Sequence, residues 1–153
     1  MGHMIESVLI RKGIEIAERT EDVCSLDPAL AGECVCIDFT TPDAFRANYR
    51  FLAENFKAVV VGTTGWNDIE GDVFKCFEEN GTALVHSSNY SIGVNAVFAA
   101  VERIGETLKG YGYVPHIDET HHIHKLDAPS GTAKTLAGIV EGSLGVKPEI
   151  NSY

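Results

Sequence analysis

The apolar positions in the first part of the chain switch repeatedly between helical spacing and short continuous runs. A first helix is predicted from apolar residues that lie three and four positions apart, namely Met4, Ile5, Val8 and Leu9. Gly13 follows as a typical helix stop. Residues 14–17 then alternate like a short strand that ends at Glu18 and Arg19. Because no strand precedes the first helix, we expect the chain to begin inside a helix.

Two longer apolar runs predict strands on either side of a second helix. Residues 34–39 form the first run, and Thr41 and Pro42 after it suit a helix cap and a first helical turn. The helix is predicted to be lined by Phe45, Tyr49 and Leu52. Residues 58–61 are uniformly apolar and mostly β-branched, as expected of a strand that is covered on both faces in a parallel sheet.

A third helix and strand complete the alternation. Apolar residues mark a helix over residues 69–77, Gly81 ends it, and residues 82–85 form another short strand. Strands that alternate with helices predict a Rossmann-like α/β fold, in which ligands lie beyond the carboxyl ends of parallel strands. Four segments leave the predicted strand ends and are expected to rim one crevice: Glu18 with Arg19, Phe39 with Thr40, Gly62 with Thr63 and Thr64, and Ser87 with Ser88, Asn89 and Tyr90.

The remaining chain predicts part of a second domain. After Ser91 a long helix presents apolar residues on one face, and residues 113–119 are again strand-like. A final helix carries a core-facing stripe of Ala133, Leu136, Ala137 and Val140. We therefore expect a dinucleotide-binding domain over residues 1–90 and part of an α+β substrate-binding and oligomerisation domain over residues 91–153.

Composition and charge narrow the class of partner. Of the 153 residues, 44% are hydrophobic, which suits a globular protein with a buried core. With 12 Lys and Arg against 22 Asp and Glu, the formal charge of -10 argues against nucleic acid and anionic membranes as partners. No apolar run reaches the length of a membrane span, and the first residues lack the pattern of a signal peptide, so we expect a cytoplasmic protein.

The cysteines predict buried reduced thiols. The chain has four of them, Cys24, Cys34, Cys36 and Cys76. They form no C-x-x-C pair and lack the spacings of thiolate metal sites. A disulfide or a bound metal is the less favoured alternative.

Two of the strand-end segments have residue types that suit a nucleotide. Glu18 stands about where a Rossmann sheet places an acidic residue on the adenosine ribose, and Arg19 suits a 2′-phosphate. A solvated charge pair is the alternative. Gly62 lets the backbone approach a ligand closely, and the hydroxyls of Thr63 and Thr64 suit amide or ribose groups, although a tight turn would use the same residues.

A histidine-rich segment, residues 119–132, contains three histidines and a lysine. His121, His122 and His124 suggest a metal site, because imidazole is a common zinc ligand. In an extended chain His121 faces away from the other two histidines, which argues against three of them converging on one ion. A metal-dependent hydrolase stays open as an alternative function, and a structural role is the alternative for any single histidine.

The end of the same segment predicts a helix start that is suited to an anion. Ser130 is a typical helix cap, and Gly131 and Thr132 begin the helix that follows it. A helix start with outward-pointing N–H groups, preceded by the cation of Lys125, is a site for a carboxylate or phosphate. An ordinary capped helix would explain Ser130 but not the histidines and lysine beside it.

Three motifs in this order resemble those of one enzyme family. Residues 119–132, ETHHIHKLDAPSGT, are similar to an acidic and a small residue followed by H-H-x-x-K-x-D-A-P-S-G-T. Residues 61–66, VGTTGW, resemble V-I-G-T-T-G-aromatic, and residues 88–95, SNYSIGVN, resemble N-F-S-x-G-V-N. The chain thus resembles the 4-hydroxy-tetrahydrodipicolinate reductases (dihydrodipicolinate reductases) of bacterial lysine biosynthesis over nearly its whole length.

The resemblance implies a role for each candidate residue. It implies that His121 is the catalytic acid/base and Lys125 a proton donor that also binds substrate. The carboxylates of a cyclic dicarboxylate would be held by His122, Ser130, Gly131 and Thr132. NADPH or NADH would be bound by Glu18, Arg19, Phe39, Gly62, Thr63, Thr64, Ser87, Ser88, Asn89 and Tyr90. The resemblance implies no metal, and it suggests a homotetramer for the complete protein.

The chain departs from the family pattern at both ends. Family members open with a strand and a G-x-x-G-x-M-G turn. Met1 and Gly2 are either the last two residues of that turn, and then bind the cofactor, or a cloning remnant. At the other end the chain stops before the further strands of the second domain, which indicates an incomplete chain. Other functions stay open: a Rossmann-type reductase of another small acid, the hydrolase, or a non-enzymatic binding module.

Overall fold

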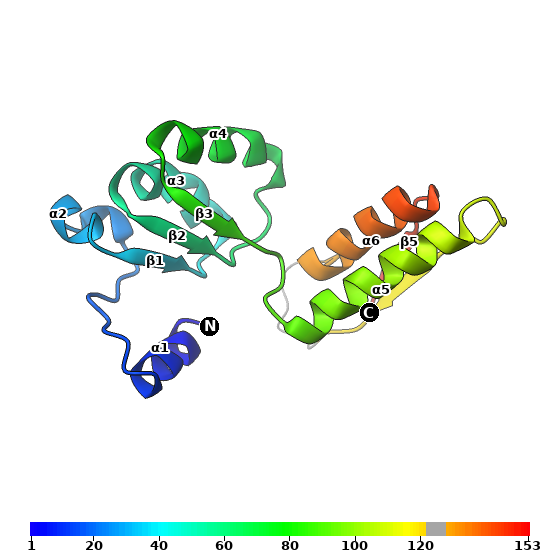
Figure 1. Cartoon of the computed structure of the whole chain (residues 1–153), viewed down its shortest axis with the longest axis horizontal. Coiled ribbons are helices and arrows are strands. Elements are labelled where there is room, and N and C mark those ends of the chain that lie inside the picture. The colour runs from blue at the N-terminus through cyan, green and yellow to red at the C-terminus, as the bar shows by residue number, and fades with distance from the viewer. Residues whose placement is uncertain (122–127) are drawn as a thin grey trace. The chain divides into compact units, whose positions relative to one another are not determined.

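The computed structural model describes residues 1–121 and 128–153. These residues form two compact units, unit 1 over Met1–Ser87 and unit 2 over Ser88–Tyr153. Their helices and strands are labelled along the chain in Figure 1. Within the described residues, no helix is both long enough and apolar enough to cross a membrane.

Unit 1 is built on a three-stranded sheet. Its strands are β1 (Val35–Asp38), β2 (Ala58–Val61) and β3 (Ala83–His86). They are parallel and lie in the order β1-β2-β3. Asp38 pairs with Val61 and Val61 with His86, so the three strands end level with one another. The parallel sheet predicted from the alternating pattern is confirmed, and the segments that follow its strands leave from one edge.

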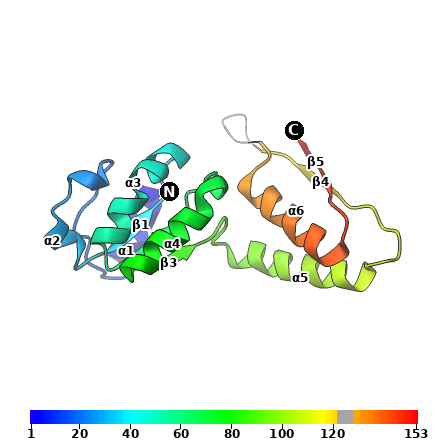
Figure 2. The same cartoon turned by 90° about the horizontal axis from the view of Figure 1, so that it is seen from above.

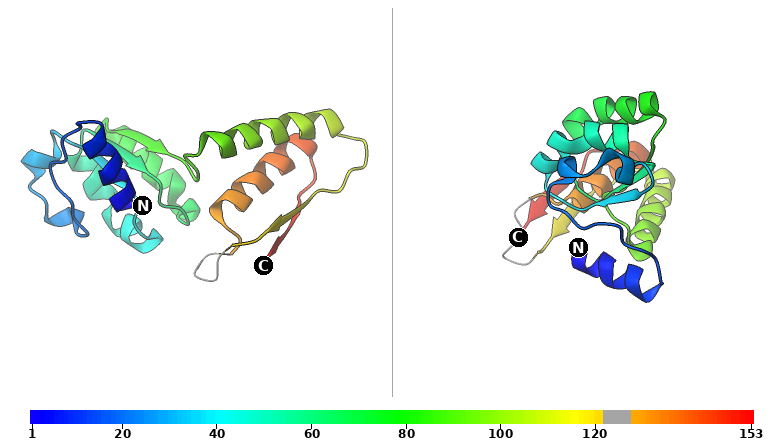
Figure 3. Two further views of the ribbon diagram at one scale, coloured as in Figure 1. Left: turned by 90° about the horizontal axis from the view of Figure 1, so that it is seen from below. Right: turned by 90° about the vertical axis from the view of Figure 1, so that its left-hand side faces the viewer.

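Two long helices connect these strands, α3 (Pro42–Asn55) and α4 (Glu70–Asn80). The Thr41 hydroxyl caps α3 by accepting a hydrogen bond from the Ala44 N–H, and Gly81 ends α4 with a φ of 68°, as the sequence predicted. A short 3-10 helix, η2 (Asn67–Ile69), precedes α4. Both long helices lie on the same side of the sheet (Figure 3).

The core of unit 1 lies between the sheet and these helices. Its largest fully buried side chains are Trp66, Phe45, Phe77, Leu52, Val59, Val61 and Val73. On the opposite face of the sheet Val35, Ile37 and Val85 are exposed. The expectation that residues 58–61 are covered on both faces is therefore wrong, because β2 alternates between buried and partly buried residues.

The first part of unit 1 differs from one prediction. Helix α1 (Gly2–Arg11) is confirmed, and Gly13 ends it with a φ of 67°. Residues 14–17, however, form no strand. The Ile14 N–H donates to the Leu9 carbonyl at 3.0 Å, so this residue completes the end of the helix, and a four-residue alternation without a neighbouring strand has no ladder to hold it extended. The short helices η1 (Val23–Ser25) and α2 (Pro28–Ala31) follow.

Unit 2 combines two helices with a pair of strands. Its elements are α5 (Ile92–Leu108), β4 (His116–Glu119), α6 (Gly131–Leu144) and β5 (Glu149–Ser152). Strands β4 and β5 are parallel, and α6 lies between α5 and this strand pair (Figure 2). The sequence predicted α5, β4 and α6 but missed β5. Gly105 of α5 packs closely against Ser143 of α6, where an added Cβ would overlap the Ser143 side chain.

The cysteines are free in the structure. Cys76 is buried in the core of unit 1, and Cys34 and Cys36 are partly buried. Burial raises the pKa of Cys36 to about 12, and the Asp38 charge adds to the effect. Cys24 is exposed, so the expectation of buried thiols is wrong for this residue. It lies in the short η1 segment, which the sequence did not predict.

Candidate functional site

The loops that follow β1 and β2 lie side by side at the carboxyl edge of the unit 1 sheet. The Gly62 N–H donates to the Asp38 carbonyl at 2.8 Å. A Cβ at Gly62 would overlap the ring of Phe39, so this close approach requires glycine. Two of the predicted cofactor segments, Phe39 with Thr40 and Gly62 with Thr63 and Thr64, are thus in direct contact.

A buried carboxylate joins these two loops. Asp38 is only 5% exposed. It accepts hydrogen bonds from the Thr63 hydroxyl at 2.5 Å and from the Thr40 hydroxyl at 3.0 Å, and the Thr40 N–H lies 3.3 Å from the same carboxylate. Sequence reasoning did not single out Asp38. Its signal was an acidic residue at the end of an apolar strand, directly before a segment chosen as cofactor-binding.

The hydroxyls of the neighbouring threonines Thr63 and Thr64 differ in availability. Thr63 is 4% exposed, and its hydroxyl both donates to Asp38 and accepts from the Thr40 N–H at 2.9 Å. Its carbonyl accepts from the indole N–H of Trp66 at 2.7 Å. Thr64 is partly exposed. The hydroxyl that the sequence assigned to a ligand at Thr63 is therefore bound within the protein, and Thr64 is the more exposed of the two residues.

Arg46 of α3 holds the same loop from outside. Its guanidinium donates to the Gly65 carbonyl at 2.8 Å and to the Asp68 carboxylate at 2.5 and 2.9 Å. This pairing raises the pKa of Arg46 and lowers the pKa of Asp68. Gly65 has a φ of 85°, a left-handed conformation that favours glycine. The loop after β2 is thus tied both to the strand ends and to a neighbouring helix.

The predicted adenosine-binding residues do not follow a strand. Glu18 and Arg19 are exposed, and the Arg19 guanidinium pairs with the Glu6 carboxylate of α1 at 2.9 Å. The placement of these two residues at the end of a first strand is wrong, because residues 14–17 form none. Met1 and Gly2 lie at the start of α1, with Met1 in the cap position.

The third strand of unit 1 ends at a histidine packed on the tryptophan of the same edge. The rings of His86 and Trp66 have centroids 4.4 Å apart. Burial lowers the pKa of His86, although the Glu70 charge and a hydrogen bond with the Thr63 backbone oppose this. Its Nε2 atom is buried without a hydrogen-bond partner among the described residues. The next residue, Ser87, donates its N–H to the Val61 carbonyl at 3.4 Å.

Two residues of the fourth predicted segment, Ser88 and Asn89, contact the start of α6 in unit 2. The hydroxyls of Ser88 and Thr135 lie 2.8 Å apart, and the Asn89 side-chain amide donates to the Thr132 hydroxyl at 3.2 Å. Tyr90 is 43% exposed. Two residues predicted to bind cofactor are thus joined to the helix start that was predicted to bind substrate.

A second carboxylate organises this helix start. Glu119, the last residue of β4, accepts hydrogen bonds from the Ser130 N–H at 2.8 Å, the Ser130 hydroxyl at 2.5 Å and the Ser152 hydroxyl at 2.7 Å. Burial raises the pKa of Glu119, but these hydrogen bonds and the charge of His121 outweigh it and lower the pKa to about 2. Glu119 therefore stays ionised at neutral pH.

The predicted catalytic histidine lies beside this carboxylate. The Nδ1 atom of His121 is 3.7 Å from the nearer Glu119 oxygen, and the imidazole is 38% exposed. Because the Ser130 N–H and hydroxyl bind Glu119, the backbone N–H groups of Gly131 and Thr132 are the donors suited to a substrate anion here. The predicted residues His122 and Lys125 lie outside the described residues.

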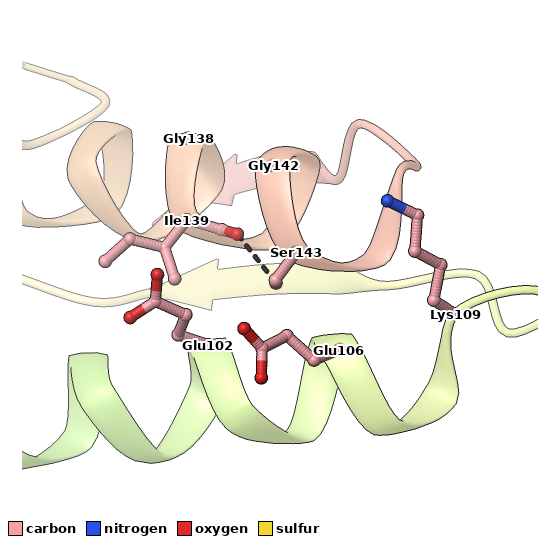
Figure 4. Close-up of a pocket in the computed structure, with 7 residues that line it drawn as sticks. All are labelled: Glu102, Glu106, Lys109, Gly138, Ile139, Gly142 and Ser143. Carbon is pink, nitrogen blue, oxygen red and sulfur yellow. Dashed lines mark hydrogen bonds between the residues drawn. The ribbon is translucent and has the colours of Figure 1, made fainter.

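The described residues also bear on metal binding and include a groove in unit 2. They contain no group of three or more His, Cys, Asp or Glu side chains that could hold a metal ion. A groove of about 370 Å³ lies between α5 and α6 (Figure 4). Its lining residues are Glu102, Glu106, Lys109, Gly138, Ile139, Gly142 and Ser143. The groove is near the end of α6, whereas the predicted substrate residues begin that helix.

Comparison with protein families accounts for both units. Residues 2–90 match the family profile "Dihydrodipicolinate reductase, N-terminus", and residues 93–151 match "Dihydrodipicolinate reductase, C-terminus". The two profiles meet close to the division between the units. The first profile contains the Asp38–Thr63 edge, and the second contains Glu119, His121 and the start of α6.

Curated relatives carry one name. The chain is 40% identical over 120 residues to a 4-hydroxy-tetrahydrodipicolinate reductase of Chromohalobacter salexigens. This alignment covers 77% of this chain and 44% of the relative. A protein of the same name from Paraburkholderia phymatum is 38% identical, and the alignment covers 81% of this chain and 46% of the relative. Another from Neisseria gonorrhoeae is 34% identical, and the alignment covers 91% of this chain and 49% of the relative. The chain thus spans about half the length of the curated relatives it matches.

A solved structure supports the fold. The chain aligns over 97% of its length with 56% of a dipicolinate-bound dihydrodipicolinate reductase from Paenisporosarcina sp. TG-14. The TM-score is 0.51 and the sequence identity 20%. At this identity the similarity is evidence for the fold, and it agrees with the Rossmann-like α/β arrangement predicted from the sequence.

Proposed function

The chain belongs to the dihydrodipicolinate reductase family, and from this premise we propose that it carries out the family's reaction as part of the complete protein. That reaction is the NAD(P)H-dependent reduction of 4-hydroxy-tetrahydrodipicolinate to tetrahydrodipicolinate on the diaminopimelate route to lysine. The substrate is a small cyclic dicarboxylate. The solved relative bound to dipicolinate, which is also a cyclic dicarboxylate, supports this choice of substrate.

One observation carries the proposal: an acid/base candidate and an anion-binding helix start share a single carboxylate. Glu119 contacts His121 at 3.7 Å and holds Ser130 by two hydrogen bonds. A dicarboxylate bound at the N–H groups of Gly131 and Thr132 would therefore lie close to an imidazole. This arrangement suits a reaction in which an anionic substrate must receive a proton.

The proposed chemistry follows from the electron flow of the reduction. The nicotinamide supplies a hydride when it is bound. The 4-hydroxyl would leave as water, which leaves a C=C bond conjugated to the C=N bond. The hydride would then add to the far carbon of that C=C bond and move electron density toward the ring nitrogen, which takes up a proton. A cation and a proton source near that nitrogen lower the barrier. We assign proton transfer to His121 and Lys125, and binding of the substrate carboxylates to His122, Ser130, Gly131 and Thr132. Ser130 acts in this assignment by fixing the helix start through Glu119.

The carboxyl edge of the unit 1 sheet fits a nicotinamide nucleotide. A Cβ at Gly62 would overlap the ring of Phe39, so glycine lets the two loops pack closely, and Thr64 is partly exposed on the same loop. We propose that these residues bind the cofactor, together with Thr63, Ser87, Ser88, Asn89 and Tyr90. Glu18 and Arg19, with Met1 and Gly2, are proposed for the adenosine and phosphate portions. We propose either NADPH or NADH as the cofactor, since Glu18 suits the free ribose of NADH and Arg19 suits the 2′-phosphate of NADPH.

Domain roles and assembly are part of the same proposal. Residues 1–90 form the dinucleotide-binding domain, and residues 91–153 form part of the substrate-binding and tetramerisation domain of a homotetrameric, cytoplasmic enzyme. The family match to separate N-terminal and C-terminal profiles supports this division. Sedimentation analysis of the complete protein would test the tetramer directly.

The central test is substrate-dependent oxidation of NADPH and NADH. We expect oxidation only when the cyclic dicarboxylate is present. His121→Ala and Lys125→Ala are expected to lower turnover by about 100-fold or more, the usual contribution of a positioned proton donor. His116→Ala is the matched control, because this exposed histidine lies on β4 close to Glu119 and is expected to keep full turnover. Wild-type turnover in both variants would remove the assigned roles.

Activity that is lost with zinc after chelation would instead favour the hydrolase interpretation of the histidines. Hydride transfer to a different small acid in a substrate panel would favour a related reductase. For the 153-residue chain alone, calorimetry with NADPH and with dipicolinate tests the two halves of the site separately. If neither ligand gives a heat of binding, this chain would act only as a scaffold within the larger protein.

A further inference from the structure

Resting on the proposed function, we propose that Asp38 is a positioning residue that fixes the nucleotide-binding loops of unit 1. Its carboxylate ties the loop after β1 to the loop after β2 through Thr40 and Thr63. In this arrangement Thr64, rather than Thr63, presents the side-chain hydroxyl that contacts the nucleotide. Asp38 itself does not touch the ligand.

The hydrogen bonds around Asp38 form a closed set between the two loops. The Thr63 hydroxyl donates to Asp38 and accepts from the Thr40 N–H, and the Thr40 hydroxyl donates to Asp38 as well. Each loop therefore binds the other both through the carboxylate and directly. A buried network that is satisfied in this way has one low-energy geometry, because removing any member leaves another buried polar group without a partner.

The same network reaches the core through Trp66. The indole N–H donates to the Thr63 carbonyl at 2.7 Å, and the indole ring packs against the ring of Phe45 in a tilted arrangement with centroids 4.7 Å apart. Trp66 is 1% exposed and is the single tryptophan of the chain. The loop after β2 is thus anchored to the core on one side and to Asp38 on the other. In folded variants, a shift in Trp66 emission reports a change in the surroundings of this side chain, which include the loop after β2.

The burial of Asp38 also matters for charge. A free carboxylate at this edge would repel the phosphates of a nucleotide, at a cost that rises where water is excluded. The donors of Thr40 and Thr63 satisfy the charge from within the protein. We therefore assign the carboxylate to holding the loops in place, and the exposed groups of Gly62 and Thr64 to contacting the ligand.

The test measures NADPH and NADH binding by calorimetry and the emission of Trp66 in the full chain. Asp38→Ala and Thr63→Val are each expected to weaken binding by about ten- to a hundredfold and to shift the emission, because each removes a hydrogen bond to a buried charged group. The double variant should bind no more weakly than the single ones, since both act on one network. Thr63→Ser keeps the hydroxyl and should restore binding.

A matched control separates positioning from stability. Thr82 has a partly buried hydroxyl that donates to the Ala53 carbonyl at 2.6 Å, but it lies just before β3, at the opposite edge of the sheet. Thr82→Val should destabilise unit 1 as Thr63→Val does and leave nucleotide affinity unchanged. Thr64→Val should weaken binding without shifting the Trp66 emission, because its hydroxyl contacts the ligand rather than the loop.

Three results would overturn the proposal: wild-type affinity in folded Asp38→Ala, an equal loss of affinity in Thr82→Val, or equal affinities for Thr63→Ser and Thr63→Val. If Asp38→Ala does not fold, the nucleotide affinities of Thr63→Ser and Thr63→Val decide between the outcomes. If the wild-type chain binds neither nucleotide, the nucleotide site of the proposed function fails. The positioning role is then tested by the Trp66 emission alone. An unchanged emission in both Asp38→Ala and Thr63→Val would contradict that role.

Discussion

The two units each end a parallel strand with a carboxylate that gathers hydroxyl and backbone N–H donors. Asp38 ends β1 of unit 1 and Glu119 ends β4 of unit 2. The donors to Asp38 come from loops that follow two neighbouring strands. Those to Glu119 come from Ser130 at the start of a helix and from Ser152 on the neighbouring strand. The same device thus holds two loops together in one unit and fixes a helix start in the other.

The difference lies in the ionisable neighbour. The hydrogen-bond donors to Asp38 described above are uncharged hydroxyl and amide groups, whereas Glu119 has His121 at 3.7 Å. A carboxylate with neutral donors is suited to holding a conformation. A carboxylate beside an imidazole can also orient that ring. In the proposed function, unit 1 accordingly binds the cofactor, and unit 2 binds the substrate and transfers a proton.

The largest expected effect comes from removing the unit 2 carboxylate. Glu119→Ala leaves the Ser130 and Ser152 donors without their acceptor and is expected to lower the free energy of unfolding by about 3 kcal/mol. Glu149→Ala is the control, because this exposed residue of β5 has only a 3.8 Å contact with His116 and should cost little. Urea unfolding followed by far-UV circular dichroism measures both. Equal losses would show that Glu119 is one more surface charge.

The same carboxylate sets an acid limit. Because the pKa of Glu119 is lowered from 4.5 to about 2, its stabilisation is fully present above pH 4.5 and is lost as pH falls toward 2. Glu119→Gln should remove this part of the pH dependence. A wild-type stability curve that is as flat as that of the variant below pH 4.5 would contradict the assignment.

The next largest effect on stability is expected from alanine at closely packed glycines. These variants compare how tightly the two units are packed. An added Cβ would overlap Phe39 at Gly62 and Ser143 at Gly105. Gly62→Ala and Gly105→Ala are each expected to cost about 1–3 kcal/mol by overpacking. Gly71→Ala and Gly138→Ala, at open helical positions, should instead be neutral or stabilising by up to about 1 kcal/mol. Thermal unfolding of the four variants would show whether both units respond alike.

A smaller effect distinguishes the units in mild acid. Burial lowers the pKa of His86, so the unfolded chain binds this proton more readily, and unit 1 should lose stability as pH falls through about 6.5. His86→Phe is expected to remove the loss. His116→Phe is the control in unit 2, on an exposed part of β4. Urea unfolding followed by Trp66 emission measures unit 1, and an unchanged pH dependence in His86→Phe would exclude His86 as its source.

The smallest effect concerns two exposed arginine ion pairs. The Arg46 guanidinium pairs with Asp68 and also donates to the Gly65 carbonyl, whereas the described ion pair of the Arg103 guanidinium in α5 is with Glu106. Arg46→Ala should shift the Trp66 emission slightly and lower the unfolding midpoint by less than Thr63→Val does. Arg103→Ala should change neither. High salt should shrink the Arg46 effect only in part, because the bond to the carbonyl is less screened than the ion pair.

Local pattern predicted the elements that have strong periodicity or clear caps. Thr41, Gly81 and Ser130 end or begin helices where expected, since capping depends on residues a few positions apart. Residues 14–17 were wrongly predicted to form a strand, and strand β5 was not predicted. A four-residue segment becomes a strand only when a neighbouring strand supplies its hydrogen bonds, and the pattern within the segment does not reveal that neighbour.

The site divides in the same way. The sequence by itself determined the family, the parallel strands and the segments that leave their carboxyl ends, because these depend on residue order and period. Only the tertiary structure decided that the hydroxyls of Thr63 and Ser130 donate to Asp38 and Glu119. We therefore propose Thr64 and the N–H groups of Gly131 and Thr132 as the ligand contacts. The two hydrogen-bonded pairs are 25 and 11 residues apart in the chain, and hydrogen bonds over such separations follow from which strands and loops become neighbours.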